Sequence, residues 1–419
     1  MDFSFFKVKI NPENSSDNLA GFGKRKNTEI TFGPKELYLK ILWVKSNSNL
    51  IVISIDALYF PRTIAQNVIR YLANTYQIAK KNIVFNATHT HSAPSTDLNV
   101  FGQINKEYLD EINIKTIQGL DFCWHNFKKG HLEFDELSLP NKLFVKRRKL
   151  GRDIRKLFLQ KKILMLPNHN RETDNNIRSI KIYDNEKKLC LIVYNFSCHP
   201  VFDFALSISS DCIGTISNAI EDQLQVQSIF LQGFAGDIRP NYTATSVKIT
   251  NIKDYLKLIF NKEIFIDYDD SFYNYFCNNI STCLIQNASE KNKNPQIPAI
   301  NIKLKSFTAN FSSITGEIQK NIEINLILIK NNLFISLPAE VNSYYYDLLK
   351  NKFPDLRIYP LGYAPGMIGY LPGAEEVDEG GYEIYSYTNY GWDSNISKKS
   401  IEYFSVKLIS EIKQLISKD

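Results

Sequence analysis

Short apolar runs alternate with longer amphipathic segments over the first 240 residues of the chain. Residues 37–44 and 50–55 are rich in β-branched and aromatic side chains and flank a polar SNSN turn, which predicts two adjacent strands. Residues 62–78 have helical spacing and follow Pro61, which suits a first helical turn. The alternation indicates an α/β fold in which a mixed β-sheet core is flanked by helices. It continues with expected strands at 82–88, 131–146 (broken at Pro140), 179–183, 189–196 and 228–232, and expected helices at 107–127 and 213–224.

The second half of the chain has a different pattern. Residues 241–298 are rich in Asn, Tyr and Phe, and we expect them to form helices and a polar loop that serve as an insertion or a lid. No low-complexity linker separates the parts of the chain, so the sequence predicts a single domain over residues 1–419. The remaining expected elements are a hairpin at 321–329 and 333–337, a helix near 341–350, a Gly-, Pro- and Tyr-rich loop at 361–392 and a closing helix at 401–417.

Composition narrows the class of protein without naming a function. The chain is 44% hydrophobic and 22% charged, which is ordinary for a globular protein and argues against disorder. We find no apolar run of about 18 residues, and therefore expect no integral membrane contact. The N-terminal residues lack a secretory pattern and the six cysteines form no dense framework, so we expect a cytoplasmic protein. The net charge of +6 comes from scattered lysines, so we expect no nucleic-acid partner.

The strongest local signal is Thr88-His89-Thr90-His91, at the end of an expected strand. In an extended chain, residues i and i+2 point to the same face, so His89 and His91 would present two imidazoles side by side at the edge of the sheet. Ligand sites of α/β proteins occur at such strand ends. Imidazole is the commonest metal ligand, so this pattern predicts a metal site.

Three other polar segments follow apolar runs. His199 ends the strand-like segment LCLIVYNFSCHP, a position where a histidine is often only a hydrogen-bonded core residue. Asp237 and Arg239 lie in the glycine-containing loop GFAGDIRPN, directly after another expected strand. Glu340 stands at a strand-to-helix junction, where a plain helix N-terminal glutamate is the alternative.

In order, the motifs THTHSAP, FSCHPV, AGDIRPN and LPAE, with a tyrosine pair twelve residues apart, resemble the catalytic domain of the neutral (alkaline, non-lysosomal) ceramidases. NLAGFGKR at 18–25, IDAL at 55–58 and VKRR at 145–148 also resemble that family. The resemblance runs from about residue 6 to 395, with an interruption at 241–298. It implies a ceramidase-like fold and a zinc-dependent hydrolase of an amide bond. We expect a relative without the immunoglobulin-like C-terminal domain and the secretion signal of the family.

The resemblance also implies a ligand set for one zinc ion. Its ligands would be His89, His199, Glu340 and Tyr370, although Ala339 replaces the Gly that precedes the family's glutamate. Asp211 and Asp237 are candidates to orient the two imidazoles.

On the substrate side, the resemblance places three catalytic residues, His91, Tyr382 and Arg147. Lys146 stands where the family has Asn before the arginine. Gly21, in the NLAGFGKR segment, and Asp237 are expected to bind substrate. His91 and Tyr382 would stabilise the oxyanion or move protons to the leaving amine.

One departure from the family bears on the substrate. Ceramidases have a serine given a catalytic role where this chain has Arg239, and an arginine cannot act as a nucleophile or a base. Our hypothesis is that Arg239 recognises an anionic or polar part of the substrate; the alternative is a structural pair with Asp237.

These observations favour a zinc-dependent hydrolase that removes an acyl group from a small, soluble, polar or anionic N-acyl substrate, such as an N-acylated amino sugar. The alternatives are true ceramide hydrolysis, an amidohydrolase barrel, which also begins with an HxH strand, and an inactive ceramidase-like binding protein. A homo-oligomer is compatible with the sequence.

Overall fold

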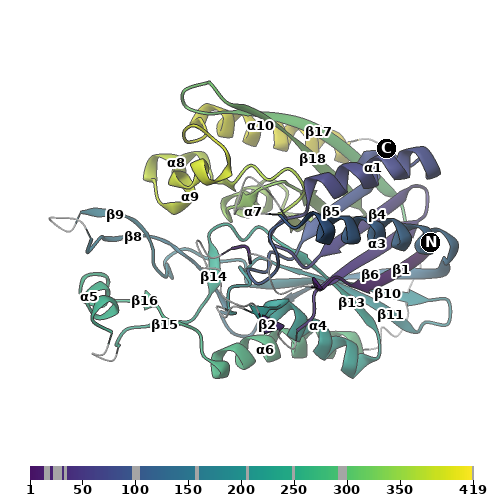
Figure 1. Ribbon diagram of the computed structural model, residues 1–419, viewed down its shortest axis with the longest axis horizontal. Coiled ribbons are helices and arrows are strands. Elements are labelled where there is room, and N and C mark those ends of the chain that lie inside the picture. The colour runs from purple at the N-terminus through teal and green to yellow at the C-terminus, as the bar shows by residue number, and fades with distance from the viewer. Residues whose placement is uncertain are drawn as a thin grey trace.

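The computed structural model describes residues 1–13, 19–21, 31–32, 35–96, 104–155, 160–203, 207–247, 251–290 and 300–417. Its largest element is an eight-stranded mixed sheet with the order β13-β11-β10-β6-β1-β3-β4-β5 (Figure 1). The pairs β4–β5 and β11–β13 are parallel and the others are antiparallel. The strands are β1 (Asp2–Lys9), β3 (Tyr38–Lys45), β4 (Asn49–Ile55), β5 (Ile83–Ala87), β6 (Lys128–Ser138), β10 (Asn176–Asp184), β11 (Leu189–Phe196) and β13 (Gln227–Gln232).

A second sheet has the order β17-β18-β19-β21 and packs on one face of the first. Alternation along β18 shows why: Ile327 and Ile329 face the large sheet, whereas Ile324 and Leu326 face the helix α10 (Lys398–Ile416). These strands are β17 (Ile302–Ser312), β18 (Gln319–Ile329), β19 (Asn332–Ser336) and β21 (Arg357–Leu361).

Helices cover the opposite face of the large sheet. Side chains of β3 and β4 on that face, such as Trp43 and Ile53, pack with α1 (Arg62–Tyr76) and α3 (Lys106–His125). Tyr194 and Phe230 pack with α4 (Asp211–Leu224) and α6 (Asp270–Ser289). The result is a helix–sheet–sheet–helix arrangement, which confirms the predicted α/β class with a mixed sheet flanked by helices. This architecture differs from that of an amidohydrolase barrel, which has eight strand–helix units.

The two edge strands of the large sheet are fastened to each other at their carboxyl ends. The Asn86 amide accepts from the Gln232 backbone N–H at 2.7 Å and donates to the Gln232 carbonyl at 3.1 Å. It also donates to the Gly362 carbonyl, which follows β21, at 2.9 Å. Three strand ends from distant parts of the chain therefore converge where the sequence places its polar motifs.

The segment 241–298 divides into two parts in the structure. Phe276 and Ile280 of α6 are buried against α4, so this helix belongs to the layer that covers the sheet. The rest, β15 (Thr243–Ala244), α5 (Ile252–Asn261) and β16 (Ile264–Phe265), extends away from the body beside the hairpin β8 (Arg148–Arg152) and β9 (Lys161–Met165). We call the described residues of 148–166 and 243–266 the arm; it lies at the left of Figure 1.

Other short elements connect the layers. They are β2 (Thr31–Phe32), η1 (Lys80–Asn82), β7 (Phe144–Lys146), β12 (Ser207–Ile208), β14 (Ile238–Pro240), β20 (Glu340–Val341), α7 (Tyr344–Lys352), β22 (Tyr370–Leu371), α8 (Ala374–Glu379), α9 (Tyr382–Tyr385) and η3 (Tyr387–Tyr390). In the part of the chain that the structure describes, no helix is long and apolar enough to span a membrane. The six cysteines form no disulfide.

Candidate metal centre

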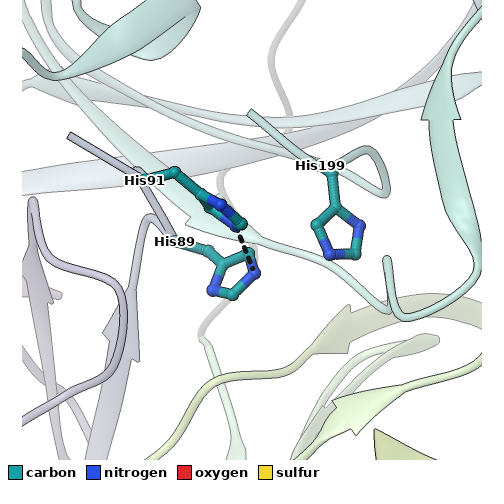
Figure 2. Close-up of side chains that lie close together, drawn as sticks. All are labelled: His89, His91 and His199. Atoms are coloured by element: carbon teal, nitrogen blue, oxygen red, sulfur yellow. Dashed lines mark hydrogen bonds between the residues drawn. The ribbon is translucent and has the colours of Figure 1, made fainter. Parts of the chain in front are cut away.

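Three histidines and a glutamate meet at the converging strand ends. His89 follows β5, His199 follows β11, and Glu340 begins β20, which pairs in parallel with β22. Figure 2 shows the three histidines close together. One ring nitrogen from each of His89, His91 and His199 lies within 4.8 Å of those of the other two. All of these residues are buried except His91, which is half-buried. The sequence thus identified a real cluster, formed by residues up to 251 positions apart (89 to 340).

The HxH segment does not continue the strand as an extended chain. β5 ends at Ala87, and His89 has a φ of 64°, in the left-handed region. This turn brings the Nε2 atoms of His89 and His91 to 3.2 Å from each other, instead of placing the rings side by side. The expectation of a simple strand-edge pair was therefore wrong in geometry. A non-glycine residue in this conformation costs about 1–3 kcal/mol, and such strain concentrates at functional sites.

Glu340 completes the centre. Its Oε2 lies 3.3 Å from Nε2 of His199 and 3.5 Å from Nε2 of His89. Its Oε1 accepts hydrogen bonds from the Tyr59 and Tyr390 hydroxyls, at 2.6 and 2.7 Å. Burial alone would raise the pKa of Glu340, but the neighbouring imidazoles hold it well below the usual range. One carboxylate oxygen is thus held by two tyrosines while the other faces the histidines.

The protonation pattern points to a cation between these groups. Nδ1 of His89 lies 2.9 Å from the Leu58 carbonyl and Nδ1 of His199 lies 3.1 Å from the Ile238 carbonyl. Because a carbonyl only accepts, both Nδ1 atoms carry the proton. Burial lowers the pKa of His199 to about 4, so its imidazole is neutral at neutral pH. With the proton on Nδ1, its Nε2 atom is available to a metal ion.

The spacing of the donors fits a small divalent ion. Tetrahedral coordination with bonds of about 2.0–2.2 Å places neighbouring donor atoms roughly 3.3–3.5 Å apart. The two separations between the ligand atoms Nε2 and Oε2, 3.3 Å for His199 and 3.5 Å for His89, match this value. The backbone carbonyls supply the orienting hydrogen bonds that ligating imidazoles require.

Tyr370, the expected fourth ligand, lies beside the centre. The register of β20 and β22 pairs it directly with Glu340. Its hydroxyl accepts a hydrogen bond from Nη2 of Arg147 at 3.1 Å. Burial raises the pKa of Tyr370 well above 10, with Glu340 adding to the effect and Arg147 opposing it. The phenol therefore stays protonated unless a cation binds its oxygen.

Arg147 and Tyr382 flank Tyr370. The Arg147 guanidinium lies 5.6 Å from the centroid of the Tyr370 ring and 5.7 Å from that of Tyr382, while Nε donates to Glu383 at 2.8 Å. The Tyr382 ring is 5.5 Å from that of Tyr370 and is 45% exposed. Tyr382 and the half-buried His91 thus form the more accessible side of the site.

The sequence did not indicate the residues that hold the predicted site residues in place. Tyr59 and Tyr390 fix Glu340, and Glu383 bridges Arg147 and Arg148 with bonds of 2.8 Å to each. The Tyr363 ring stacks on His89 with centroids 4.0 Å apart. Tyr59 directly follows the IDAL segment, a position that would have drawn attention to it, but the other tyrosines carry no local signal in a chain with 23 of them.

The comparisons with known proteins agree with this architecture. No protein-family model matches the chain, and no curated protein matches it. Among solved structures, neutral ceramidase from Pseudomonas aeruginosa superposes with a TM-score of 0.72 at 12% identity, over 98% of this chain and 73% of the ceramidase chain. A ceramidase complexed with C2 gives a TM-score of 0.71 at 12% identity, over 98% and 74% of the two chains.

The chain has the neutral ceramidase fold. The likeness covers nearly the whole chain. It confirms the fold that the resemblance implied.

Within this ceramidase fold, Gly21 contacts the histidines. It has a φ of 106°, and a Cβ atom there would lie 2.6–2.7 Å from the His91 ring. Only glycine fits that approach, so Gly21 sets the position of His91 from the side. Its neighbours 14–18 and 22–30, which include most of the NLAGFGKR motif, lie outside the described residues.

Two other predicted residues, Asp211 and Asp237, have different partners from those expected. Asp211 accepts from the backbone N–H groups of Phe202, Asp203 and Cys212, and so shapes the loop after β11. Asp237 accepts from the backbone N–H and the hydroxyl of Ser343, at 2.6 and 2.9 Å. Neither orients an imidazole, because backbone carbonyls do so, and that expectation was wrong.

Arg239 and Asp237 both lie among the described residues, and they form no ion pair with each other. The Arg239 guanidinium lies 4.8 Å from the centroid of Phe265 and donates to the Tyr268 hydroxyl at 3.1 Å. The residue that replaces the family's serine thus rests on aromatic rings of the segment 265–268.

Proposed function

We propose that the protein is a metal-dependent hydrolase of the amide bond of an N-acylated amine, with zinc as the ion. The observation that carries the proposal is the convergence of the His199 and His89 Nε2 atoms on Oε2 of the buried Glu340, at 3.3 and 3.5 Å, while both Nδ1 atoms face backbone carbonyls. The donor set of histidine nitrogens and a carboxylate is one that zinc accepts. The ceramidase fold around it supports amide hydrolysis as the reaction.

In this proposal His89, His199, Glu340 and Tyr370 hold the ion. A bound zinc ion supplies a Lewis acid for a carbonyl oxygen and lowers the pKa of water to about 7. The protein supplies the remaining functions. Arg147 positions the Tyr370 oxygen, and Glu383 in turn fixes Arg147. The second imidazole, His91, and the Tyr382 phenol lie on the accessible side, where they would orient the substrate carbonyl and deliver a proton to the leaving nitrogen.

For the substrate we propose a small N-acyl compound, and two classes are open to direct comparison. Polar N-acylated amino sugars follow from the sequence argument on Arg239 and Asp237. N-acyl lipids of the ceramide type are favoured by a specific observation: Tyr382 and Tyr385 of α9 are exposed beside the hairpin of the arm. Contact of Arg239 with aromatic rings gives no support to an anionic substrate.

The test combines metal quantification with a substrate screen. Purified protein should contain about one zinc per chain, and it should hydrolyse one member of a panel of N-acyl amino sugars and detergent-solubilised ceramides. His89→Ala should lose both metal and activity, whereas His125→Ala, on the surface end of α3, should retain both. A wild-type protein with neither bound metal nor activity would show that the fold serves as a binding protein, and a His89→Ala variant with full metal content and activity would overturn the proposed metal site.

A further inference from the structure

The arm has a small core of its own. Leu166, Leu258 and Ile264 are buried against one another, apart from the main layers. Asn261 at the end of α5 accepts from the Arg152 backbone N–H at 2.7 Å and donates to its carbonyl at 3.2 Å, which joins the helix to the hairpin. The arm is therefore one folded unit, and what it exposes is held in a fixed arrangement.

The helix α5 is oriented with its apolar stripe toward solvent. An amphipathic helix normally buries that stripe, but the buried residue of α5 is Leu258, on the opposite side. Spacing of i, i+3, i+4, i+7 and i+8 puts the exposed apolar residues on one face. They are Ile252, Tyr255, Leu256, Ile259 and Phe260, with exposed fractions of 58, 38, 39, 56 and 36%.

The hairpin exposes apolar residues on its other face. Leu150 and Met165 are 61 and 39% exposed, and by alternation they lie on the face opposite Gly151, which packs on α5. That face packs against α9, since a Cβ atom on Gly381 would lie 2.9 Å from Ile163. Tyr382 and Tyr385 of α9 are 45 and 66% exposed. The hairpin thus joins α5 to the element that carries Tyr382.

Positive charge surrounds the apolar residues of the arm. The described residues of the arm include nine basic and three acidic side chains, a net charge equal to the +6 of the whole chain. Each acid has a partner: Asp153 pairs with Arg155 and Lys162, Asp254 pairs with Lys257, and Glu263 accepts from the Thr243 hydroxyl. The charge of an otherwise balanced protein is therefore concentrated on the arm.

We propose that the arm docks on the surface of an anionic lipid bilayer, with α5 lying in the interface. Aromatic and aliphatic residues on one helix face with lysines at its borders are the pattern of helices that bind at the headgroup boundary. A second copy of the chain would bring equal positive charges together, which opposes self-association through this face. The proposal does not depend on catalysis, but it would place the mouth of the site next to membrane-resident N-acyl lipids.

Sedimentation with lipid vesicles tests the proposal on the full-length protein. Vesicles of phosphatidylcholine with about 30% phosphatidylserine should bind the protein at low salt, and pure phosphatidylcholine vesicles should bind it much less. Ile252→Ser/Ile259→Ser should weaken binding roughly tenfold or more, because two apolar side chains no longer enter the interface. Lys253→Gln/Lys257→Gln should weaken it about fivefold per lysine and reduce its salt dependence.

The matched control is Tyr403→Ser/Val406→Ser on α10, which removes two side chains of similar exposure (61 and 69%) away from the arm. It should bind as the wild type does. The proposal is overturned if the wild type ignores anionic vesicles, if the α5 double variant binds them unchanged, or if neutral vesicles bind equally well. It is also overturned if the wild type is a dimer that the α5 double variant converts to a monomer, since α5 would then be an interface between copies. Circular dichroism of each variant confirms folding.

Discussion

The metal centre buries polar groups, whereas the arm exposes apolar ones. At the centre, polar groups that would prefer water are buried, and partners such as the two tyrosines on Glu340 hold them in place. On the arm, apolar groups that would prefer the core are exposed, and a small cluster around Leu258 holds the helix in place. Since each arrangement costs stability by itself, each indicates a function that lies outside the isolated fold: a cation for the centre, and an apolar partner surface for the arm.

The largest effect is expected from Glu340→Gln at the metal centre. The amide has the same shape but lacks the charge, so we expect metal content to fall and activity to drop on the order of 10³-fold, the loss of several kcal/mol of transition-state stabilisation. A chelator should lower the melting temperature of the wild type and leave that of the variant unchanged, because only the wild type carries the ion. Equal chelator sensitivity in both proteins would mean that the metal is held elsewhere.

The next effect concerns the buried charges that support the centre. Arg147→Ala leaves Glu383, which is 1% exposed, with Arg148 as its remaining charged partner. We expect a loss of about 3–5 kcal/mol in the free energy of unfolding, measured by urea denaturation. Arg171→Ala is the matched control, because its ion pair with Glu379 is solvent-exposed and is worth about 0–1 kcal/mol. A loss below 1 kcal/mol in Arg147→Ala would contradict the view that the Arg147–Glu383 pair is a rigid support.

A smaller effect is expected from the hydroxyls behind Glu340. Tyr390→Phe removes one hydrogen bond to Oε1, and the metal affinity should fall about 10–100-fold, as is usual when the support of a ligand is lost. Competitive titration with a chromophoric chelator measures it. Tyr345→Phe removes the hydroxyl of another buried tyrosine, which donates to the Pro372 carbonyl and not to Glu340, so its affinity should equal that of the wild type.

The smallest effect belongs to the arm. Ile252→Ser/Ile259→Ser alters only exposed side chains, and we expect the free energy of unfolding to change by no more than about 0.5 kcal/mol per substitution. Thermal denaturation in the absence of lipid measures it. A destabilisation of several kcal/mol would show that the apolar face of α5 is covered in the folded protein, and the contrast between the two regions would disappear.

Much of the fold could be predicted because the signals were local. The strands β3, β4, β5 and β11 and the helices α1, α3 and α4 were identified from alternation and spacing, to within a few residues. β1 was missed, since Asp2–Lys9 was read only for a leader peptide. The orientation of α5 could not be predicted from the sequence either. Its period predicts an amphipathic helix, but only tertiary packing decides which face is turned inward.

At the site, sequence motifs and resemblance indicated the groups that would contact a metal, and the structure brings His89, His199, Glu340 and Tyr370 together. The supporting residues were not predictable in the same way. Tyr390 reaches Glu340 from 50 positions away along the chain through the packing of two loops, and it has no distinctive neighbours. Chemical type identifies a ligand, whereas only the fold identifies what holds that ligand.

The left-handed backbone at His89 has a consequence for how this protein would change under selection. Glycine or asparagine adopts that conformation more easily than histidine does, so substitution at this one position should relieve strain while removing a metal ligand. A library screened for heat resistance in the presence of a chelator, where the metal adds no stability, should therefore accumulate Gly or Asn at position 89, and one screened for turnover should retain His. Position 89 is where thermal robustness and chemistry are in direct conflict.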